Sequence, residues 1–384
     1  MSYHGRFESQ KPQKKKSPKK IILIIVAVLL VLVIGAVAAG VLYYNSTLNK
    51  MNHVEVPKIQ YTTPEDDLFA DPEGIETEET AAVENTETVP TETTEPPHVV
   101  SSEDFINILV VGQASRAGET ANSERMADTA ILCTINTYEK KLTLTSFLRD
   151  SLVRPPNFRG HEFGKIKLTT VYHLGSYYSN GDIAGSMELM NKTLYDSFGI
   201  EVDHNFEVDF DIFMKVVDLM GGVSVNLTQE EADYLNSEDG WIGYTVTPGE
   251  FHLDGAGALC YARMRKAEGD GDSDIKRTAR QRHLIDRLIF GLKWLSISDI
   301  NEMANQIMPM ITTSMTTAEI TELMIKLVPM IFELQVETGG TCPVQGTYRG
   351  VEKDIYGDGM YHSVLEFEVP QQKKLMRAIT EGES

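Results

Sequence analysis

An uninterrupted apolar run near the N-terminus constrains this chain more than any other feature. Residues 21–44 form twenty-four consecutive positions without a charged side chain. As an α-helix the run would extend about 36 Å, enough to cross a hydrocarbon core of about 30 Å. The apolar region of a cleaved signal peptide is shorter, at about 7–15 residues. The sequence therefore predicts a transmembrane signal-anchor helix, with cleavage near the small residues at Gly40 as the alternative.

Basic residues on one side of this run predict its orientation. Residues 1–20 carry seven basic side chains and one acidic one, whereas the first basic residue after the run is Lys50. Because positive charge is retained on the cytoplasmic side, we expect residues 1–20 to form a basic cytoplasmic tail that contacts anionic lipid. Everything after Tyr44 is then predicted to be extracellular.

A strongly acidic segment follows the apolar run. Residues 59–104 contain fourteen acidic side chains and no basic one, and residues 62–99 are rich in Glu, Thr and Pro. Such a composition buries too little apolar surface to offset the entropy of ordering the chain. We expect residues 45–104 to form an extracellular stalk that holds a domain, residues 105–384, away from the bilayer. The net charge of −21 argues against nucleic-acid binding, which needs a positive surface.

The domain has the pattern of a mixed α/β protein. Apolar runs predict strands, two of them joined by a polar turn as an antiparallel hairpin, and a 3.6-residue spacing predicts helices. We expect a mixed central sheet covered by helices on both faces, an α/β/α sandwich. The predicted strands are 106–112, 129–136, 141–148, 206–210, 223–227, 258–265 and, after a Gly-rich loop, 364–369; the predicted helices are 183–198, 211–220, 275–295, 299–310, 317–334 and a last one from about 371.

Arginines gather between residues 261 and 282. If residues 258–265 form a strand, Arg263 and Arg265 point to one face of it. Arg277 and Gln281 lie one helical turn apart, with Arg280 beside them. A guanidinium group suits phosphate oxygens and stays charged when buried. The cluster favours an anionic ligand with several oxygens, although salt bridges to the acidic residues that precede the helix are an alternative.

Two further charged pairs lie at the ends of predicted strands. Arg149 and Asp150 follow the strand 141–148, and Arg125 and Asp128 precede its partner strand. Side chains at strand ends often form binding sites, because the ends of neighbouring strands meet at one edge of a sheet. These residues therefore strengthen the hypothesis of an anion site.

Other kinds of site find less support. Asp270, Asp272 and Asp274 match the first half of an EF-hand loop, but Ile275 and Gln281 stand where Gly and Glu are required. Capping of the following helix is the better interpretation. No nucleophile elbow, P-loop or HExxH motif is present, and His252, His283 and His362 have no evident triad partners. Three cysteines do not form a disulfide scaffold: Cys133 and Cys260 lie in apolar runs and Cys342 in a predicted loop.

The order of these segments resembles the LytR-CpsA-Psr (LCP) family of membrane-anchored cell-wall proteins. The resemblance begins near Phe105, covers about three-quarters of the chain, and includes ADTAILCTIN, LTLTSFLRDS, LDGAGALCYARMR and RTARQR. It implies an α/β/α sandwich with a hydrophobic groove for a lipid tail, in the cell membrane of a Gram-positive-type bacterium. It implies transfer of a glycopolymer, such as teichoic acid or capsule polysaccharide, from a polyprenyl-pyrophosphate carrier to peptidoglycan, with Mg²⁺ as cofactor.

The resemblance also assigns roles to particular residues. It implies that Asp128 binds the metal and that the arginines and Gln281 bind the pyrophosphate. Asp128, Arg149, Arg263 and Arg265 would form the catalytic set; the pyrophosphate-binding set would be Arg125, Arg149, Arg263, Arg265, Arg277 and Gln281.

Two departures from the family pattern bear on this site. Ala114 stands where the family has a second metal-binding Asp, and Lys167 stands where an Asn is usual and could add a phosphate contact. Two other functions remain open from the sequence: hydrolysis of the lipid pyrophosphate by a phosphatase or pyrophosphatase, and non-catalytic binding or regulation at the cell envelope.

Overall fold

The computed structural model describes residues 46–59, 102–113, 126–264, 273–292, 296–330 and 333–382. The chain divides into two units, residues 1–50 and 51–384. The predicted cytoplasmic tail and transmembrane helix lie outside the described residues. Within the described ranges, no helix is long and apolar enough to cross a membrane.

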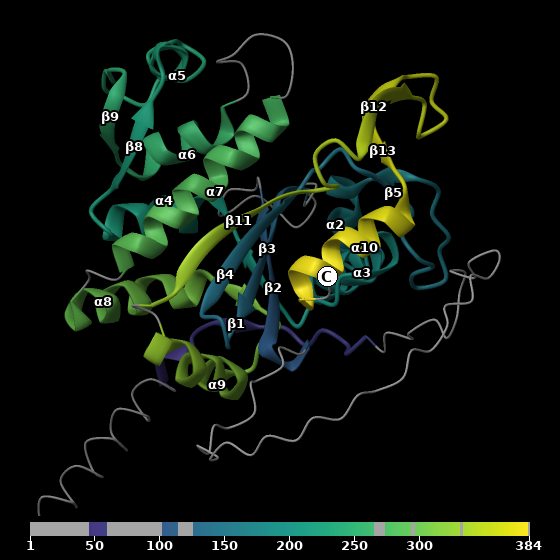
Figure 1. Cartoon of the computed structure of the whole chain (residues 1–384), viewed down its shortest axis with the longest axis horizontal. Coiled ribbons are helices and arrows are strands. Elements are labelled where there is room, and N and C mark those ends of the chain that lie inside the picture. Colours follow the sequence, from purple (N-terminus) through teal and green to yellow (C-terminus); the bar gives the residue numbers. More distant parts are fainter. Residues whose placement is uncertain are drawn as a thin grey trace, which may run out of the picture. The chain divides into compact units, whose positions relative to one another are not determined.

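A seven-stranded mixed sheet organises the second unit (Figure 1). Its strands follow the order β1-β10-β7-β2-β3-β4-β11. The predicted hairpin is confirmed, because β3 pairs antiparallel with β4 and also with β2. β2 pairs parallel with β7, and β4 with β11. The strands are β1 Asn52–His53, β2 Phe105–Gln113, β3 Ala127–Asn136, β4 Lys141–Phe147, β7 His204–Val208, β10 Thr312–Thr313 and β11 Gln335–Cys342.

Helices cover both faces of this sheet, as predicted (Figure 1). Alternation along β2 divides its side chains, so that Leu109 joins the core under α2, α3 and α10, and Ile108 joins the core under α7 and α9. The predicted helix 183–198 is confirmed to the residue as α3. The helices are α2 Leu168–Tyr177, α3 Ile183–Phe198, α7 Ser273–Leu292, α8 Ile297–Ile307, α9 Thr317–Leu327 and α10 Val369–Thr380.

A smaller lobe with its own hydrophobic core stands beside the sheet. It is built from α4 (Phe210–Leu219), β8 (Val223–Leu227), α5 (Gln229–Leu235), β9 (Gly249–Leu253) and α6 (Gly255–Arg263). Leu284 of α7 joins this core, whereas Ile285 and Ile289 of the same helix face the sheet. α7 therefore links the lobe to the sheet.

The prediction of a strand over residues 258–265 is wrong, because residues 258–263 lie in α6. Asp254 starts the helix: its carboxylate accepts a hydrogen bond from the Gly257 backbone N–H at 2.8 Å. Ala258, Tyr261 and Ala262 are then buried on one side, at the spacing of a helix face. The run of apolar residues predicted a strand, but the N-cap at Asp254 and the helical spacing of the buried residues favour a helix.

The predicted Gly-rich loop near the C-terminus is largely strand. β11 pairs with β4, and β12 (Tyr348–Lys353) pairs antiparallel with β13 (His362–Phe367). Gly339 is needed where β11 approaches β4, since a Cβ there would lie 2.1 Å from Thr145 Oγ1. Cys342, which we expected in a loop, ends β11 fully buried, and burial raises the pKa of its thiol. Cys260 lies in α6, and Cys133 lies in β3 as expected.

The folded unit begins earlier than the predicted domain boundary at residue 105. Residues from Met51 onward belong to the second unit, and β1 pairs parallel with β10. The Val54 backbone N–H donates to the Thr313 carbonyl at 2.9 Å, and Val56 packs against the core. β1 is only two residues long, so it shows no alternation of apolar and polar residues that would predict a strand. The acidic composition of the residues after it therefore led to the prediction of a stalk. Residues 60–101 of the predicted stalk lie outside the described residues.

Candidate active site

One edge of the sheet collects most of the predicted site residues that the structure describes. β2 and β7 end at this edge, where Gly112 is opposite both Thr129 and Val208 in the strand registers. β3 runs the other way and begins there, so Asp128 lies at the edge as its second residue. β4 also ends there, two residues before Arg149. The carboxyl ends of parallel strands in such sheets are the usual place for ligands.

Four charged side chains form a chain of ion pairs along this edge. Arg149 Nη1 donates to Asp128 Oδ1 at 3.3 Å, and Arg149 Nε lies 3.5 Å from Asp150 Oδ2. Lys167 Nζ, at the start of α2, donates to Asp150 Oδ1 at 2.7 Å. The side chains are between 19% and 34% exposed, so each is partly shielded but reachable from solvent. An anionic ligand could therefore replace the carboxylates as the partner of the two cations.

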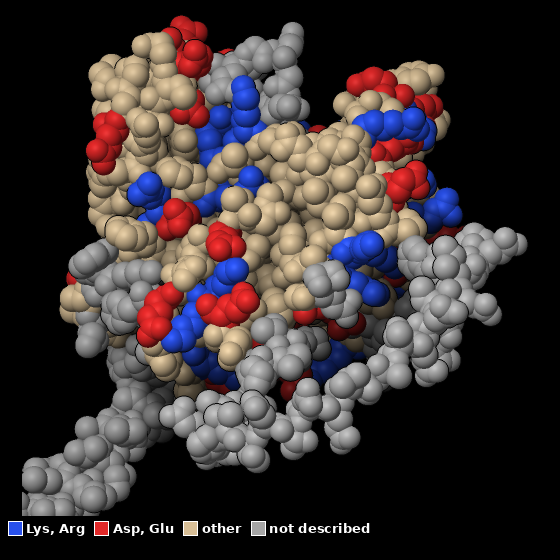
Figure 2. Space-filling model, viewed as in Figure 1, with Lys and Arg blue, Asp and Glu red and all other residues tan. Residues whose placement is uncertain are grey.

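Helix α7 brings a further part of the predicted cluster to the same edge. Gln281 Nε2 donates to Thr129 Oγ1 at 3.0 Å, which fixes this helix against the beginning of β3. Arg277 lies one turn earlier and is only 4% exposed. Figure 2 shows Lys and Arg side chains gathered along the course of α7, between the small lobe and the sheet. Gln281 therefore lies at the same edge as Asp128, and Arg277 lies one turn earlier on the same helix.

Arg280 does not belong to this anion-binding group, contrary to our expectation from its position. It is buried, its Nη1 donates to Glu231 Oε1 at 3.3 Å, and its Nη2 donates to the Met264 carbonyl at 2.5 Å. It thus joins α7 to α5 and to the end of α6. Arg280 holds the backbone immediately after Arg263 instead of facing a ligand.

Arg263 reaches the edge by a different route from the one predicted. It is the last residue of α6, and its guanidinium lies over the ring of Phe210, 4.5 Å from the centroid. Phe210 begins α4 two residues after β7, so Arg263 stands beside the carboxyl end of that strand. Because Arg263 ends a helix, the prediction that it shares a strand face with Arg265 is wrong. Arg265, Arg125 and Ala114 lie outside the described residues.

A metal site is only partly represented in the described residues. Across these ranges, no three His, Cys, Asp or Glu side chains are grouped so that they could hold a metal ion. Asp128 supplies one half-exposed carboxylate, which already accepts a hydrogen bond from Arg149. Mg²⁺ commonly binds through one or two carboxylates, waters and substrate phosphates. Asp128 therefore fits this ion when phosphate oxygens supply further ligands. α7 begins at Ser273, and Asp270 and Asp272 of the proposed cap are not described.

Several partners in the site carry weak sequence signals. Asp150 and Thr129 follow the predicted residues Arg149 and Asp128, yet their contacts come from Lys167 and Gln281, which are far away along the chain. Phe210 gave no signal as a platform for Arg263. Adjacency to a predicted site residue was the one hint that could have identified Asp150 and Thr129.

Comparison with known proteins gives a family match and several relatives. The LytR_cpsA_psr family matches residues 73–355. A TagU from Oceanobacillus iheyensis, named as a polyisoprenyl-teichoic acid–peptidoglycan teichoic acid transferase, is 32% identical over 183 residues, 48% of this chain and 50% of the relative. Biofilm regulatory protein A from Streptococcus mutans is 28% identical over 194 residues, 50% of this chain and 45% of the relative. The chain thus spans about half the length of these relatives.

A solved structure of a Bacillus subtilis protein has the same fold. TagT with bound octaprenyl pyrophosphate lipid aligns with a TM-score of 0.50 and 22% sequence identity. The alignment covers 73% of this chain and 92% of that one. At this identity the likeness supports the mixed sheet with its helices and nothing finer.

Proposed function

The chain belongs to the LytR_cpsA_psr family, and from that premise we propose that it transfers a glycopolymer from a polyprenyl-pyrophosphate carrier to peptidoglycan. The observation that carries the proposal is the group of Arg149, Lys167 and Arg263 beside Asp128 at one sheet edge. The name of the TagU relative states teichoic acid transfer, and the TagT structure contains a polyprenyl pyrophosphate. A teichoic acid or a capsule polysaccharide would be the polymer.

The chemistry follows from where negative charge develops during such a transfer. An acceptor hydroxyl attacks the phosphorus that carries the glycan, a new P–O bond forms, the P–O–P bond of the pyrophosphate breaks, and the polyprenyl phosphate leaves with the bonding electrons. Guanidinium and ammonium groups that hold these oxygens stabilise the developing charge more than they stabilise the bound ester. Arg149 is poised for this role, because a phosphate oxygen can take the place of a carboxylate beside it. The proton of the hydroxyl needs a base, for which Asp128 or another carboxylate is the candidate.

The proposed cofactor is Mg²⁺, with Asp128 as its protein ligand. When bound, the ion would neutralise charge on the phosphate oxygens. A single carboxylate holds Mg²⁺ weakly unless the substrate completes its coordination. We therefore expect calorimetry to detect little Mg²⁺ binding to the free protein and clear binding once octaprenyl pyrophosphate is present. Tight binding to the free protein would mean that further carboxylates form the site.

The proposed location is the cell membrane, with the folded unit outside. The charge difference across residues 21–44 supports this orientation. Protease added to intact cells should then digest residues after the span and leave residues 1–20 protected. Protection of the folded unit would contradict the orientation.

A transfer assay tests the proposed reaction directly. Labelled lipid-linked glycan and peptidoglycan are mixed with the full chain, and label is followed into the peptidoglycan. We expect transfer by the wild type, a large loss in Arg149→Ala, and normal transfer in Arg349→Ala, a control at an exposed arginine on β12. Release of label into solution would indicate the phosphatase or pyrophosphatase alternative. Carrier binding without transfer or release would indicate the regulatory alternative, which the name of the Streptococcus mutans relative also suggests.

A further inference from the structure

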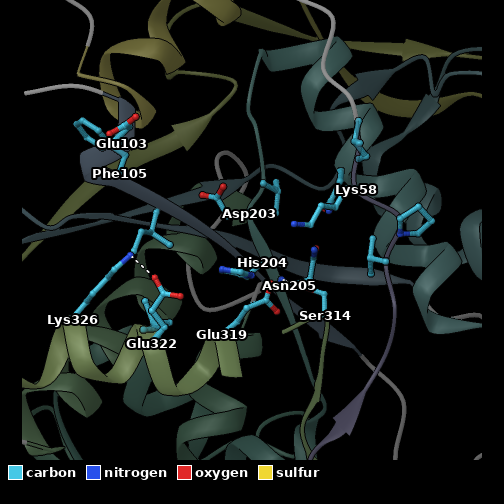
Figure 3. A pocket seen from close by; sticks show the side chains of 17 residues that line it. Lys58, Glu103, Phe105, Asp203, His204, Asn205, Ser314, Glu319, Glu322 and Lys326 are labelled. Carbon is cyan, nitrogen blue, oxygen red and sulfur yellow. Dashed lines mark hydrogen bonds and ion pairs between the residues drawn. The ribbon is translucent and has the colours of Figure 1, made fainter. Parts of the chain in front are cut away.

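The proposed transfer needs a surface for its acceptor as well as a site for its donor. The acceptor hydroxyl must reach the edge where Asp128 and Arg149 lie. A cavity of about 520 Å³ at the other edge of the sheet, with Phe105 and His204 in its wall, is too distant for this purpose (Figure 3). Gly112 at the reacting edge lies seven residues after Phe105 in β2, or about 23 Å away at about 3.3 Å per residue. An acceptor surface must therefore adjoin the reacting edge itself.

The β12–β13 hairpin adjoins this edge. The Leu365 backbone N–H donates to the Asp150 carbonyl at 2.9 Å, and Leu365 also forms a parallel bridge with Ser151. Asp150 is the residue whose carboxylate pairs with Lys167. From this anchor the hairpin projects away from the body of the folded unit (Figure 1). Its base is thus fixed beside the reacting edge, and its tip, residues 354–361, stands out from the surface.

Exposed tyrosines connect the hairpin tip to helix α2. The hydroxyl of Tyr356, in the tip, lies 3.4 Å from Thr170 Oγ1, in the first turn of α2. Thr170, His173 and Tyr177 occupy one face of α2, at positions i, i+3 and i+7. The rings of His173 and Tyr177 are 6.1 Å apart, and Tyr177 is 65% exposed. These four residues form a continuous surface, the tyrosine strip, to which Tyr361 adds a further exposed ring at the tip.

The tip is held in one conformation although its tyrosines are exposed. The Asp354 carboxylate accepts hydrogen bonds from the backbone N–H groups of Gly357 and Gly359, at 2.7 and 3.0 Å. The ring of Tyr356 also packs edge-on against His362, with the centroids 4.9 Å apart. Side chains that are ordered before binding lose less conformational entropy when a ligand arrives. A rigid tip with exposed rings therefore suits a binding surface.

The charges of the hairpin do not suit an anionic partner. Residues 348–367 contain two basic and four acidic side chains. Both basic side chains, Arg349 and Lys353, pair with Glu366. A teichoic acid or an anionic bilayer surface is attracted by clustered basic side chains, which this hairpin lacks. The observations therefore favour an uncharged partner over a polyanion or a membrane.

Sugar rings match the groups of the tyrosine strip. The faces of a sugar ring carry C–H groups that pack on aromatic rings, and its hydroxyls both donate and accept hydrogen bonds. Tyr177 and Tyr356 each supply an apolar ring with a polar end. Thr170 and His173, between them, supply hydrogen-bonding groups. Thr170 and Tyr177 are seven residues apart in α2, or about 10 Å, so the strip suits a chain of sugars better than a single ring.

We propose that the tyrosine strip holds the glycan strand of peptidoglycan, so that an acceptor hydroxyl reaches the edge beside Lys167. The strip begins at Thr170, three residues after Lys167, and the hairpin is anchored on Asp150. The identity of the partner rests on the proposed function, but the strip shares no residue with the arginine and aspartate edge. Its tyrosines position the acceptor and take no part in the chemistry.

Sedimentation with purified peptidoglycan tests the strip. The full chain in detergent is mixed with insoluble peptidoglycan that carries no teichoic acid, and the bound fraction is measured. We expect Tyr177→Ser and Tyr356→Ser each to weaken binding about tenfold, as for an aromatic anchor at an interface. Binding of octaprenyl pyrophosphate and the melting temperature should stay unchanged. Tyr138→Ser, at a similarly exposed position between β3 and β4, and Arg349→Ala, at the base of the hairpin, are the controls and should sediment normally.

A conservative variant tests how the strip binds. Tyr356→Phe keeps the ring and loses only the hydroxyl near Thr170, so it should retain most of the binding. A loss as large as that of Tyr356→Ser would overturn stacking as the basis of recognition. No sedimentation of the wild type, or normal sedimentation of both serine variants, would overturn the proposal as a whole.

The transfer assay separates this inference from the proposed function. The serine variants should raise the KM for peptidoglycan and leave the KM for the lipid-linked donor unchanged. A higher KM for donor presented in vesicles, with normal sedimentation, would show that the tyrosines contact the bilayer and would overturn the proposal. Sedimentation that depends on the tyrosines, without any transfer by the wild type, would refute the proposed function and leave the strip as a glycan site.

Discussion

The two ends of the central sheet satisfy their polar groups in opposite ways. At the Asp128 edge, Arg149 and Lys167 already have carboxylate partners, so a ligand that binds these two cations must exchange with groups of the protein. At the opposite edge, where β2 and β7 begin, the side-chain oxygens of Asn191 and Asn205 are buried without a hydrogen-bond donor among the described residues. The difference teaches that charged side chains can gather in a stable fold when they form ion pairs with one another. Buried groups that have no partner must be neutral, because burying an unpaired charge costs far more free energy than burying an unpaired amide.

The largest expected effect comes from breaking the pairing of Arg280. Removing it in Arg280→Met leaves Glu231 buried without its counter-charge, so we expect a loss of about 3–5 kcal/mol in the free energy of unfolding. Urea denaturation measures this loss, and Arg287→Met, at an exposed position of the same helix, should show almost none. Adding Glu231→Gln to Arg280→Met should recover part of the stability. An unchanged unfolding curve for Arg280→Met would contradict the pairing described above.

A smaller change in free energy is expected when Arg263 is replaced, because Arg263 is exposed and does not pair with a buried carboxylate. Arg263→Ala should weaken binding of octaprenyl pyrophosphate by about 1.5–3 kcal/mol, the range of a charged hydrogen bond, with an unchanged melting temperature. Arg265→Ala should have a similar effect on binding. Surface plasmon resonance with immobilised protein can measure both, with Arg349→Ala as the control. If Arg263→Ala binds normally, the stacking on Phe210 is structural only.

Lys167 affects how strongly Asp150 competes with a bound phosphate for Arg149, because Lys167 itself pairs with Asp150. Without this ammonium group, Arg149 alone faces both Asp128 and Asp150. Lys167→Gln should therefore weaken octaprenyl pyrophosphate binding by about 1 kcal/mol, a modest value for a partly exposed pair. Adding Asp150→Asn should restore most of the affinity, and this double-mutant cycle isolates the interaction between the two side chains. Additive losses would mean that Lys167 acts independently of Asp150.

The smallest effect concerns the sheet between its two ends. Cys342 is fully buried, and burial raises the pKa of its thiol. This thiol should then stay protonated at pH 8 and react with iodoacetamide only after unfolding, as mass spectrometry of the labelled peptides would reveal. Labelling of Cys342 in the native protein would show that this face of the sheet opens to solvent.

Local sequence patterns predicted the centre of the fold better than its periphery. The runs that form β2, β3, β4 and α3 carry their own periodicity, and the turn between β3 and β4 brought Asp128 and Arg149 together. By contrast, β11 is a strand because it pairs with β4, which lies far away in the sequence. The direction of Arg280 likewise depends on Glu231, 49 residues earlier. No local pattern contains such partners, which is why the arginine cluster was predicted as a group but not sorted into ligand-facing and structural members.

The early pairing of β1 with β10 has a consequence for how the proposed transferase would meet its substrates. With residues 21–44 spanning the membrane as proposed, only residues 45–50 separate the span from the folded unit. Six residues reach about 20 Å even when fully extended, and residues 46–48 form a helical turn, which shortens this reach. The folded unit would then be tethered to the membrane and would diffuse laterally with its transmembrane helix. It would meet a lipid-linked donor by diffusion in two dimensions. The cell-wall polymer would have to come within the short distance that the tether allows.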